Sequence, residues 1–170
     1  MPDEVVWTER TEVTDRIEAL LQDAGVEFRL YQHEPVFTSQ QAAQVRGTTP
    51  EEGAKALLIK TDDRFYLIII SGTLRVDNKR LRHILGTRQV RFATEEELLQ
   101  LTVCRPGAVP PFGNLFGLPV LMDESLHRCE RVSFNAGSNS WSVTMKREDF
   151  ERLAQPRVCA FAVDTRMQNS

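Results

Sequence analysis

Phe65-Tyr66-Leu67-Ile68-Ile69-Ile70 is the most apolar stretch of the chain. It follows a second run, Ala56-Leu57-Leu58-Ile59-Lys60, after the polar connection Asp62-Asp63-Arg64. Two such runs separated by a few polar residues are typical of a β-hairpin. Because the later run is apolar at almost every position, we expect it to be buried on both faces, in the middle of a sheet.

The sequence before this hairpin predicts a helix, a strand and a second helix. Apolar residues first recur at helical spacing up to Gly25, then alternate with polar residues, then return to helical spacing. Thr38 or Ser39 is a candidate N-cap for the second helix, and Gly47 a candidate end. The segments are residues 17–24, 26–31 and 39–45, with a further helix start at 49–52.

The sequence after the hairpin mixes helices and strands without a regular order. Asp77 is a candidate cap, and Thr94 with Glu97 forms a capping-box pattern. About seven strands and five helices in all indicate a single α+β domain over residues 13–163 with a mixed sheet, and residues 1–12 and 164–170 as flexible ends. The helices expected here begin after residues 77 and 94 and span 147–154, and the strands are 89–93, 120–122, 132–136, 141–145 and 158–163.

The composition is that of an ordinary globular protein. The 170 residues are 26% charged, with a formal net charge of −3, which excludes a strongly basic protein that coats nucleic acid by charge alone. The three cysteines, Cys104, Cys129 and Cys159, are far apart and suggest no disulfide framework. The chain begins without a signal-peptide pattern and holds no apolar run that could cross a bilayer. We expect a cytoplasmic protein.

The common signatures of cofactor and metal sites are missing from the sequence. There is no glycine-rich dinucleotide motif, P-loop, His-Glu-x-x-His or Gly-x-Ser-x-Gly. His33, His83 and His127 stand in separate segments without companion ligands at metal spacing. We therefore expect no cofactor and no metal.

Two loops stand out. Pro106-Gly107-Ala108-Val109-Pro110-Pro111-Phe112-Gly113 combines stiff prolines with glycines, which suits the wall of a small pocket or a plain crossover between strands. Asn135-Ala136-Gly137-Ser138-Asn139-Ser140 lies between two strands and is either a pocket wall or a simple hairpin turn.

In order along the chain, four motifs make the sequence similar to the YbaK/prolyl-tRNA synthetase-associated editing-domain family. This family includes free-standing trans-editing proteins that deacylate mischarged tRNA. The resemblance covers residues 17–153. The motifs are His33-Glu34-Pro35-Val36-Phe37-Thr38, Gly53-Ala54-Lys55-Ala56-Leu57-Leu58, Gly107-Ala108-Val109-Pro110-Pro111 and Phe134-Asn135-Ala136-Gly137-Ser138.

The resemblance implies a curved mixed sheet with a pocket for the 3′-terminal adenosine of tRNA and its esterified amino acid. It implies that Lys55 is catalytic. It also implies a partner, aminoacyl-tRNA, and an association with prolyl-tRNA synthetase. Some alanine-specific members have His where this chain has Asn139. The substrate-binding residues implied are His33, Phe37, Thr38, Gly107, Ala108, Val109, Pro110, Pro111, Ala136, Gly137, Ser138 and Asn139.

Ester hydrolysis needs a positioned water and stabilisation of a developing oxyanion. Lys55 can supply positive charge, and the backbone N–H groups of residues 107–109, in the loop 106–113 (the Gly107 loop), can act as donors. The expected activity is deacylation of mischarged tRNA, most simply tRNA-Pro carrying alanine, cysteine or serine. The alternative is a non-catalytic module that is associated with a synthetase and binds aminoacyl-tRNA or a nucleotide. A cluster of basic side chains around one predicted helix could contact the acceptor stem or form a solvated face. It comprises Arg75, Lys79, Arg80, Arg82 and Arg88.

Overall fold

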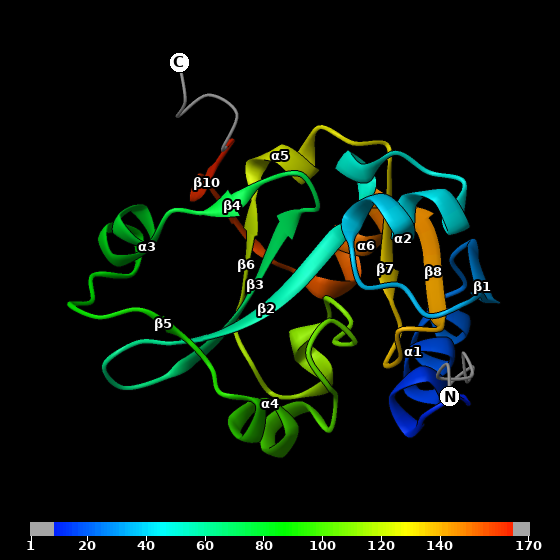
Figure 1. Cartoon of the computed structure of the whole chain (residues 1–170), viewed down its shortest axis with the longest axis horizontal. Helices are drawn as coiled ribbons and strands as arrows, with labels where there is room; N and C mark the ends of the chain where they lie inside the picture. Colours follow the sequence, from blue (N-terminus) through cyan, green and yellow to red (C-terminus); the bar gives the residue numbers. More distant parts are fainter. Residues whose placement is uncertain (1–8, 165–170) are drawn as a thin grey trace, which may run out of the picture.

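The expected hairpin forms β2 (Ala54–Lys60) and β3 (Phe65–Ser71), which pair antiparallel with Lys55 opposite Ile70. The computed structural model describes residues 9–164 (Figure 1). Within them, β3 is the middle strand of a five-stranded mixed sheet with the order β5-β2-β3-β6-β9. The central position predicted for β3 is therefore confirmed. The other strands of this sheet are β5 (Arg91–Phe92), β6 (Val120–Asp123) and β9 (Arg157–Cys159).

Each face of β3 packs into a different core. Leu67 and Ile69 are fully buried in the larger cluster, which also contains Phe112, Phe134 and Phe150. Ile68 and Ile70 are fully buried in a smaller cluster on the opposite face. Successive side chains of a strand point to opposite faces, so a strand between two cores must be apolar at every position.

A second sheet stands beside the start of β2. It contains β1 (Phe28–Gln32), β8 (Trp141–Lys146) and β7 (Arg131–Asn135), all antiparallel. A parallel bridge between Gly53 and Ser133 joins it to the five-stranded sheet. A third, two-stranded sheet pairs β4 (Arg75–Val76) with β10 (Ala162–Val163). The α+β class with a mixed sheet is confirmed.

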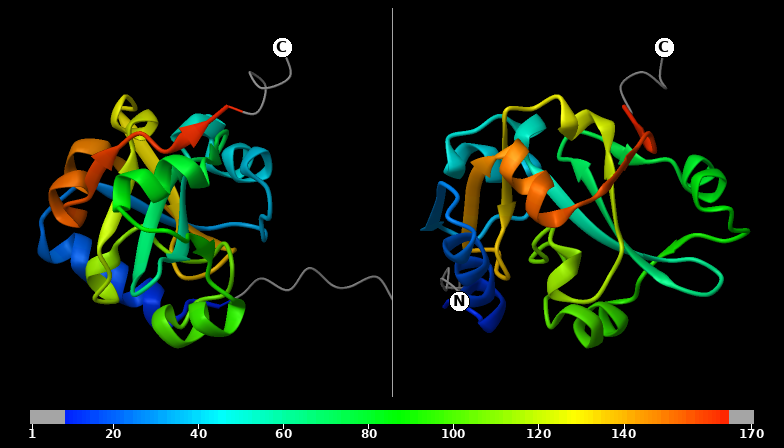
Figure 2. Two further views of the ribbon diagram at one scale, coloured as in Figure 1. Left: turned by 90° about the vertical axis from the view of Figure 1, so that its left-hand side faces the viewer. Right: turned by 180° about the vertical axis from the view of Figure 1, so that it is seen from behind.

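The two faces of the β1-β8-β7 sheet differ in chemistry. Val143 belongs to the apolar core together with residues of α1 (Glu12–Asp23) and α6 (Arg147–Ala154). Ser142, the preceding residue of β8, points to the other face, where it contacts Arg46 at the end of α2 (Ser39–Arg46). Figure 2 shows α1 (blue) and α6 (orange) on the face of this sheet that is away from α2 (cyan). The polar face is thus the one that borders the site described below.

The predicted helix caps are confirmed. Thr38 accepts a hydrogen bond from the N–H of Gln41 at the start of α2, and Asp77 caps α3 (Asn78–Leu85). Thr94 and Glu97 form the predicted capping box of α4 (Glu95–Thr102). Short range signals of this kind fix where helices begin.

The last predicted strand, 158–163, is wrong as a single element. It is divided into β9 and β10, which belong to different sheets. The buried carboxylate of Asp123 causes the break, because its Oδ1 accepts from the N–H groups of Phe161 and Ala162, each at 3.0 Å.

Other expected elements are shorter than predicted. The helix start at 49–52 is a single 3-10 turn, η1 (Pro50–Glu52), and the strand at 89–93 is reduced to β5. α5 (Glu124–His127) and a second 3-10 turn, η2 (Gly113–Leu115), were not predicted. Residues 9–164 contain ten strands and six α-helices, where the sequence predicted about seven and five.

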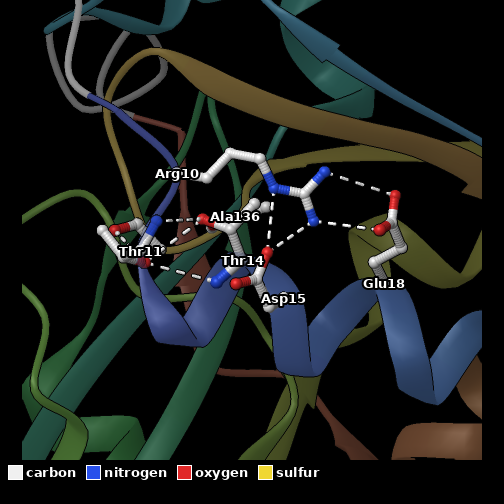
Figure 3. A network of polar contacts seen from close by, with 7 residues as sticks. Arg10, Thr11, Thr14, Asp15, Glu18 and Ala136 are labelled. Carbon is white, nitrogen blue, oxygen red and sulfur yellow. Dashed lines mark hydrogen bonds and ion pairs between the residues drawn. The ribbon is translucent and has the colours of Figure 1, made fainter.

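The described part of the chain begins in a network that fixes the start of α1. Thr11 and Thr14 form a capping box, and Thr14 Oγ1 donates to the carbonyl oxygen of Ala136 at 2.7 Å (Figure 3). Arg10 pairs with Asp15 and Glu18.

Residues 1–8 and 165–170 lie outside the described range, so the flexibility of the ends and the domain bounds stay predictions. Between residues 9 and 164, no helix has the length and apolar character that crossing a membrane requires.

Candidate active site

A cavity of about 190 Å³ opens between α2, η1 and the first residues of β2. The Gly107 loop and the end of β7 close its other side. Such a volume is below the roughly 300 Å³ at which pockets for drug-sized ligands begin, so it suits a small group. The lining residues are 36–39, 42, 43, 46, 49, 50, 53–57, 72, 106, 107, 109, 135 and 139.

Lys55 is one of two cationic side chains in this cavity. It is half-buried in β2, and its Nζ donates to the carbonyl oxygen of Leu74 at 3.2 Å. Burial lowers the pKa of Lys55 below its usual value, and the positive charge of Arg75 lowers it further. The ammonium group therefore lies in a partly desolvated site beside a second cation.

Arg46 is the other cation, and the sequence analysis did not single it out. It ends α2 and is only 8% exposed. Its Nε donates to Ser142 Oγ at 3.0 Å and its Nη2 to Asn135 Oδ1 at 2.9 Å. Burial lowers the pKa of Arg46 to about 10, so the guanidinium stays charged at neutral pH.

His33 supports this guanidinium without lining the cavity. Its Nδ1 lies 2.7 Å from the carbonyl oxygen of Glu34, which can only accept, so Nδ1 carries the proton. Its Nε2 then accepts from Ser142 Oγ at 2.7 Å, which leaves the serine oxygen free to accept from Arg46. Burial lowers the pKa of His33, consistent with a neutral ring.

Asn135 connects Arg46 to the Gly107 loop. Its Oδ1 accepts from Arg46, while its Nδ2 donates to the carbonyl oxygen of Gly107 at 2.7 Å. Gly107 has φ +82°, and a Cβ there would lie 3.4 Å from Asn139 Oδ1. The loop therefore needs glycine at this position to lie against the two asparagines.

The backbone of β2 also faces the cavity. In an antiparallel pair, alternate residues point their N–H and C=O groups to opposite edges. The carbonyl oxygen of Leu58 accepts from the N–H of Ala93, on the edge away from β3. Ala56 points its backbone groups to this same edge, beyond the end of β5, where the cavity begins. A backbone donor and acceptor are thus available to a ligand.

The structure brings six of the predicted site residues to the cavity. They are Phe37, Thr38, Lys55, Gly107, Val109 and Asn139. The other seven are buried and lie outside its lining: His33, Ala108, Pro110, Pro111, Ala136, Gly137 and Ser138. The turn containing Gly137 faces α1, because a Cβ on Gly137 would lie 2.7 Å from Thr11 Oγ1.

Sequence reasoning missed Arg46 and did not name the small residues of α2 and β2 that form the walls. It included Asn135 in a loop that was a candidate pocket wall but gave this residue no role of its own. Arg46 is the last residue of a short helix, a position where a basic side chain is ordinary. Its burial depends on Ser142, 96 residues later in the chain. No local signal could have identified it.

The described residues give little support to metal or thiol chemistry. Within residues 9–164, no three His, Cys, Asp or Glu side chains are grouped so that they could hold a metal ion. Burial raises the pKa of the Cys104 thiol to about 11, so it is protonated at neutral pH. A protonated, buried thiol is a poor nucleophile.

Residues 33–153 match the model of the aminoacyl-tRNA editing domain. The chain belongs to this family. It is 34% identical over 151 residues to the multifunctional Ser/Thr-tRNA deacylase ProXp-y of Escherichia coli, which covers 86% of this chain and 90% of that protein. The resemblance to an editing-domain family inferred from the four motifs is therefore confirmed.

Two further similarities cover most of the chain. The prolyl-tRNA editing protein ProX of Acetoanaerobium sticklandii is 25% identical over 143 residues, which is 81% of this chain and 87% of ProX. A crystal structure described as a candidate trans-editing enzyme for prolyl tRNA synthetase superposes with a TM-score of 0.82 at 24% identity, over 91% of this chain and 99% of its own. The latter shows that the fold is shared.

Proposed function

We propose that this editing-family protein hydrolyses the ester bond between a small amino acid and the 3′-terminal ribose of a mischarged tRNA. One observation carries the proposal: a small cavity, in a chain of this family, holds two cations against neutral walls. Among the described residues that line it there is no aspartate or glutamate. Such a site favours a ligand with anionic oxygens.

The reaction needs little chemistry from the protein. The oxygen of a water molecule bonds to the ester carbonyl carbon, the bond to the ribose oxygen breaks, and a proton from the water ends on that oxygen. Lys55 supplies positive charge to the terminal phosphate or the ester carbonyl. Of the Gly107 loop, Gly107 and Val109 line the cavity, and their backbone N–H groups act as donors, with the Val109 side chain as an apolar wall. No covalent intermediate is formed.

The cavity sets the size of the amino acid removed. Val109 is 4% exposed and packed in the core, so its side chain cannot move aside to make room for a larger amino acid. A fixed wall rejects a larger side chain by overlap. Asn139 and Asn135 add polar lining. ProXp-y is named for serine and threonine, so these two are the first cargo to test, followed by alanine and cysteine.

The names of the relatives support a proposal for the substrate tRNA and for the partner. ProX is named as a prolyl-tRNA editing protein, which supports tRNA-Pro as the first tRNA to test. Association with prolyl-tRNA synthetase and a cytoplasmic setting are part of the same proposal.

A deacylation screen tests the function. Purified protein is incubated with tRNA charged with serine, threonine, alanine or cysteine, on tRNA-Pro and on the cognate tRNAs, and the remaining ester is measured over time. We expect hydrolysis of at least one small-residue species beyond the spontaneous rate. If every species is hydrolysed at the spontaneous rate while tRNA still binds, the protein is a binding module and the proposal is wrong.

A further inference from the structure

Arg46 is a buried cation without a counter-charge. It is 8% exposed, and no carboxylate within residues 9–164 forms an ion pair with it. Its two fixed partners, Ser142 Oγ and Asn135 Oδ1, are neutral. Burying an unpaired charge is costly. A site with an unpaired buried positive charge beside a cavity is arranged for a ligand that carries, or develops, negative charge.

The network around Arg46 fixes the orientation of the guanidinium. Nε and Nη2 are held by hydrogen bonds to two strands of the β1-β8-β7 sheet. The third nitrogen, Nη1, reaches the start of β2: a Cβ on Gly53 would lie 3.7 Å from it. Since Gly53 also lines the cavity, Nη1 is the donor that remains for a ligand. A donor held rigidly before the reaction is the kind that stabilises a transition state most effectively.

The depth of the two cations separates their roles. The aminoacyl group is the very end of a charged tRNA, so it must occupy the deepest part of the cavity, and the phosphodiester follows toward the opening. Arg46 is buried, whereas Lys55 is half-buried and lies beside the exposed Arg75. This order brings Arg46 to the ester and leaves Lys55 and Arg75 nearer to the phosphate.

We propose that Arg46 is a second catalytic residue, whose Nη1 donates to the ester carbonyl oxygen as negative charge develops on it. This rests on the proposed deacylase function. As the water oxygen bonds to the carbonyl carbon, the carbonyl π electrons move to that oxygen and return when the ribose oxygen leaves. The guanidinium gives up no proton and takes none, so its contribution is purely electrostatic.

The first test separates kcat from KM. Arg46→Gln and Arg46→Lys are compared with the wild-type protein on its best substrate, with circular dichroism to show that each is folded. Loss of an oxyanion donor lowers kcat by about 100-fold or more. We expect this loss in Arg46→Gln, with a KM within a few-fold of wild type, and a partial loss in Arg46→Lys. Arg152→Gln, on the exposed side of α6, is the matched control and should retain wild-type kinetics.

The second test is chemical rescue, which a merely structural role would not permit. Guanidinium chloride, far below denaturing concentrations, should restore kcat of Arg46→Ala several-fold, with sodium chloride as the ionic-strength control. It should not restore Lys55→Ala. If Arg46→Ala does not fold, the kcat and KM of Arg46→Lys decide whether Arg46 acts in catalysis.

Three outcomes would overturn the proposal: an unchanged kcat in Arg46→Gln, a loss confined to KM, or equal rescue of Lys55→Ala. The wild-type deacylation screen distinguishes the proposed function from the proposed role of Arg46. Absence of wild-type deacylation refutes the proposed function itself, whereas wild-type activity that does not depend on Arg46 refutes only this inference.

Discussion

The N–H of Gly137 donates to the carbonyl oxygen of Ala108 at 2.8 Å, which joins the two loops that are most unusual in the sequence. The Gly107 loop reaches the cavity, and of the second loop Asn135 and Asn139 line it. The turn at Ala136–Ser138 instead supports the Gly107 loop from behind and is held by α1 (Figure 3). The Gly107 loop therefore borders the ligand, while this turn sets its position.

Gly137→Ala should destabilise the protein more than it alters the cavity. Gly137 has φ +85°, and an added Cβ would lie 2.7 Å from Thr11 Oγ1 and 2.9 Å from Val13 Cβ. The strained backbone alone costs about 1–3 kcal/mol. Urea unfolding should show a loss of at least this size. Gly86→Ala, also at positive φ but with open space around it, should cost less. Equal losses would contradict the close approach to α1.

Lys55→Ala should abolish deacylation while leaving the protein folded. The aliphatic part of Lys55 is only half-buried and Nζ contacts a single carbonyl, so little stability depends on it. Rates on the best substrate and thermal melting measure the two effects. Lys60→Ala, at the far end of β2 and outside the cavity, is the control and should remain active. Activity near the wild-type rate in Lys55→Ala would refute its proposed role.

Phe37→Ala should weaken tRNA binding without a loss of stability. Phe37 lines the cavity yet is 78% exposed, as expected of an aromatic ring that stacks on a base. Stacking of this kind is worth about 1–3 kcal/mol. We expect KM or the dissociation constant to rise by roughly 10-fold, measured by fluorescence anisotropy with labelled tRNA. Leu99→Ala, an exposed apolar residue on α4, should bind normally.

Stability should fall in mild acid because of His33. Burial lowers its pKa, so the folded state favours the neutral ring, while the unfolded chain titrates near the ordinary value of about 6.5. Below that pH the unfolded state binds more protons, and the free energy of unfolding decreases until the pH passes the lowered pKa. Urea unfolding across this range measures the slope. His33→Gln should flatten it.

The basic cluster should contribute to tRNA affinity through charge. Lys79 and Arg82 belong to α3, directly after Arg75, whose charge acts on Lys55. Phosphate contacts make binding strongly salt-dependent, and each one removed lowers the slope of log K against log salt by about 1. Lys79→Gln with Arg82→Gln should therefore reduce the slope measured with uncharged tRNA. A slope equal to that of Arg152→Gln would identify the cluster as a solvated face.

Features encoded by neighbouring residues were predicted well from the sequence. The run 65–70 predicted a central strand because burial on two faces requires apolar residues throughout. Caps such as Thr38 and Asp77 were predicted because each bonds within three residues of itself. The loop 106–113 was singled out by its prolines and glycines as a pocket wall or a crossover, whereas Lys55 entered only through the resemblance to the family.

Features that depend on distant partners were not predicted. Asp123 divides the last strand through bonds to residues 38 and 39 positions later. Arg46 becomes part of the site only because Ser142 and Asn135 meet it from other strands. Such residues carry no local pattern, so their roles require the folded chain.

The family match, residues 33–153, is smaller than the unit that folds together. It omits α1, whose Ile17 and Leu21 are fully buried, and β1, which pairs with β8 along five residues. A fragment cut at those limits would expose the apolar face of β8 and leave its edge unpaired. Open edges of this kind recruit strands from other molecules. Insolubility of such a fragment would therefore come from a missing neighbour and not from a faulty active site.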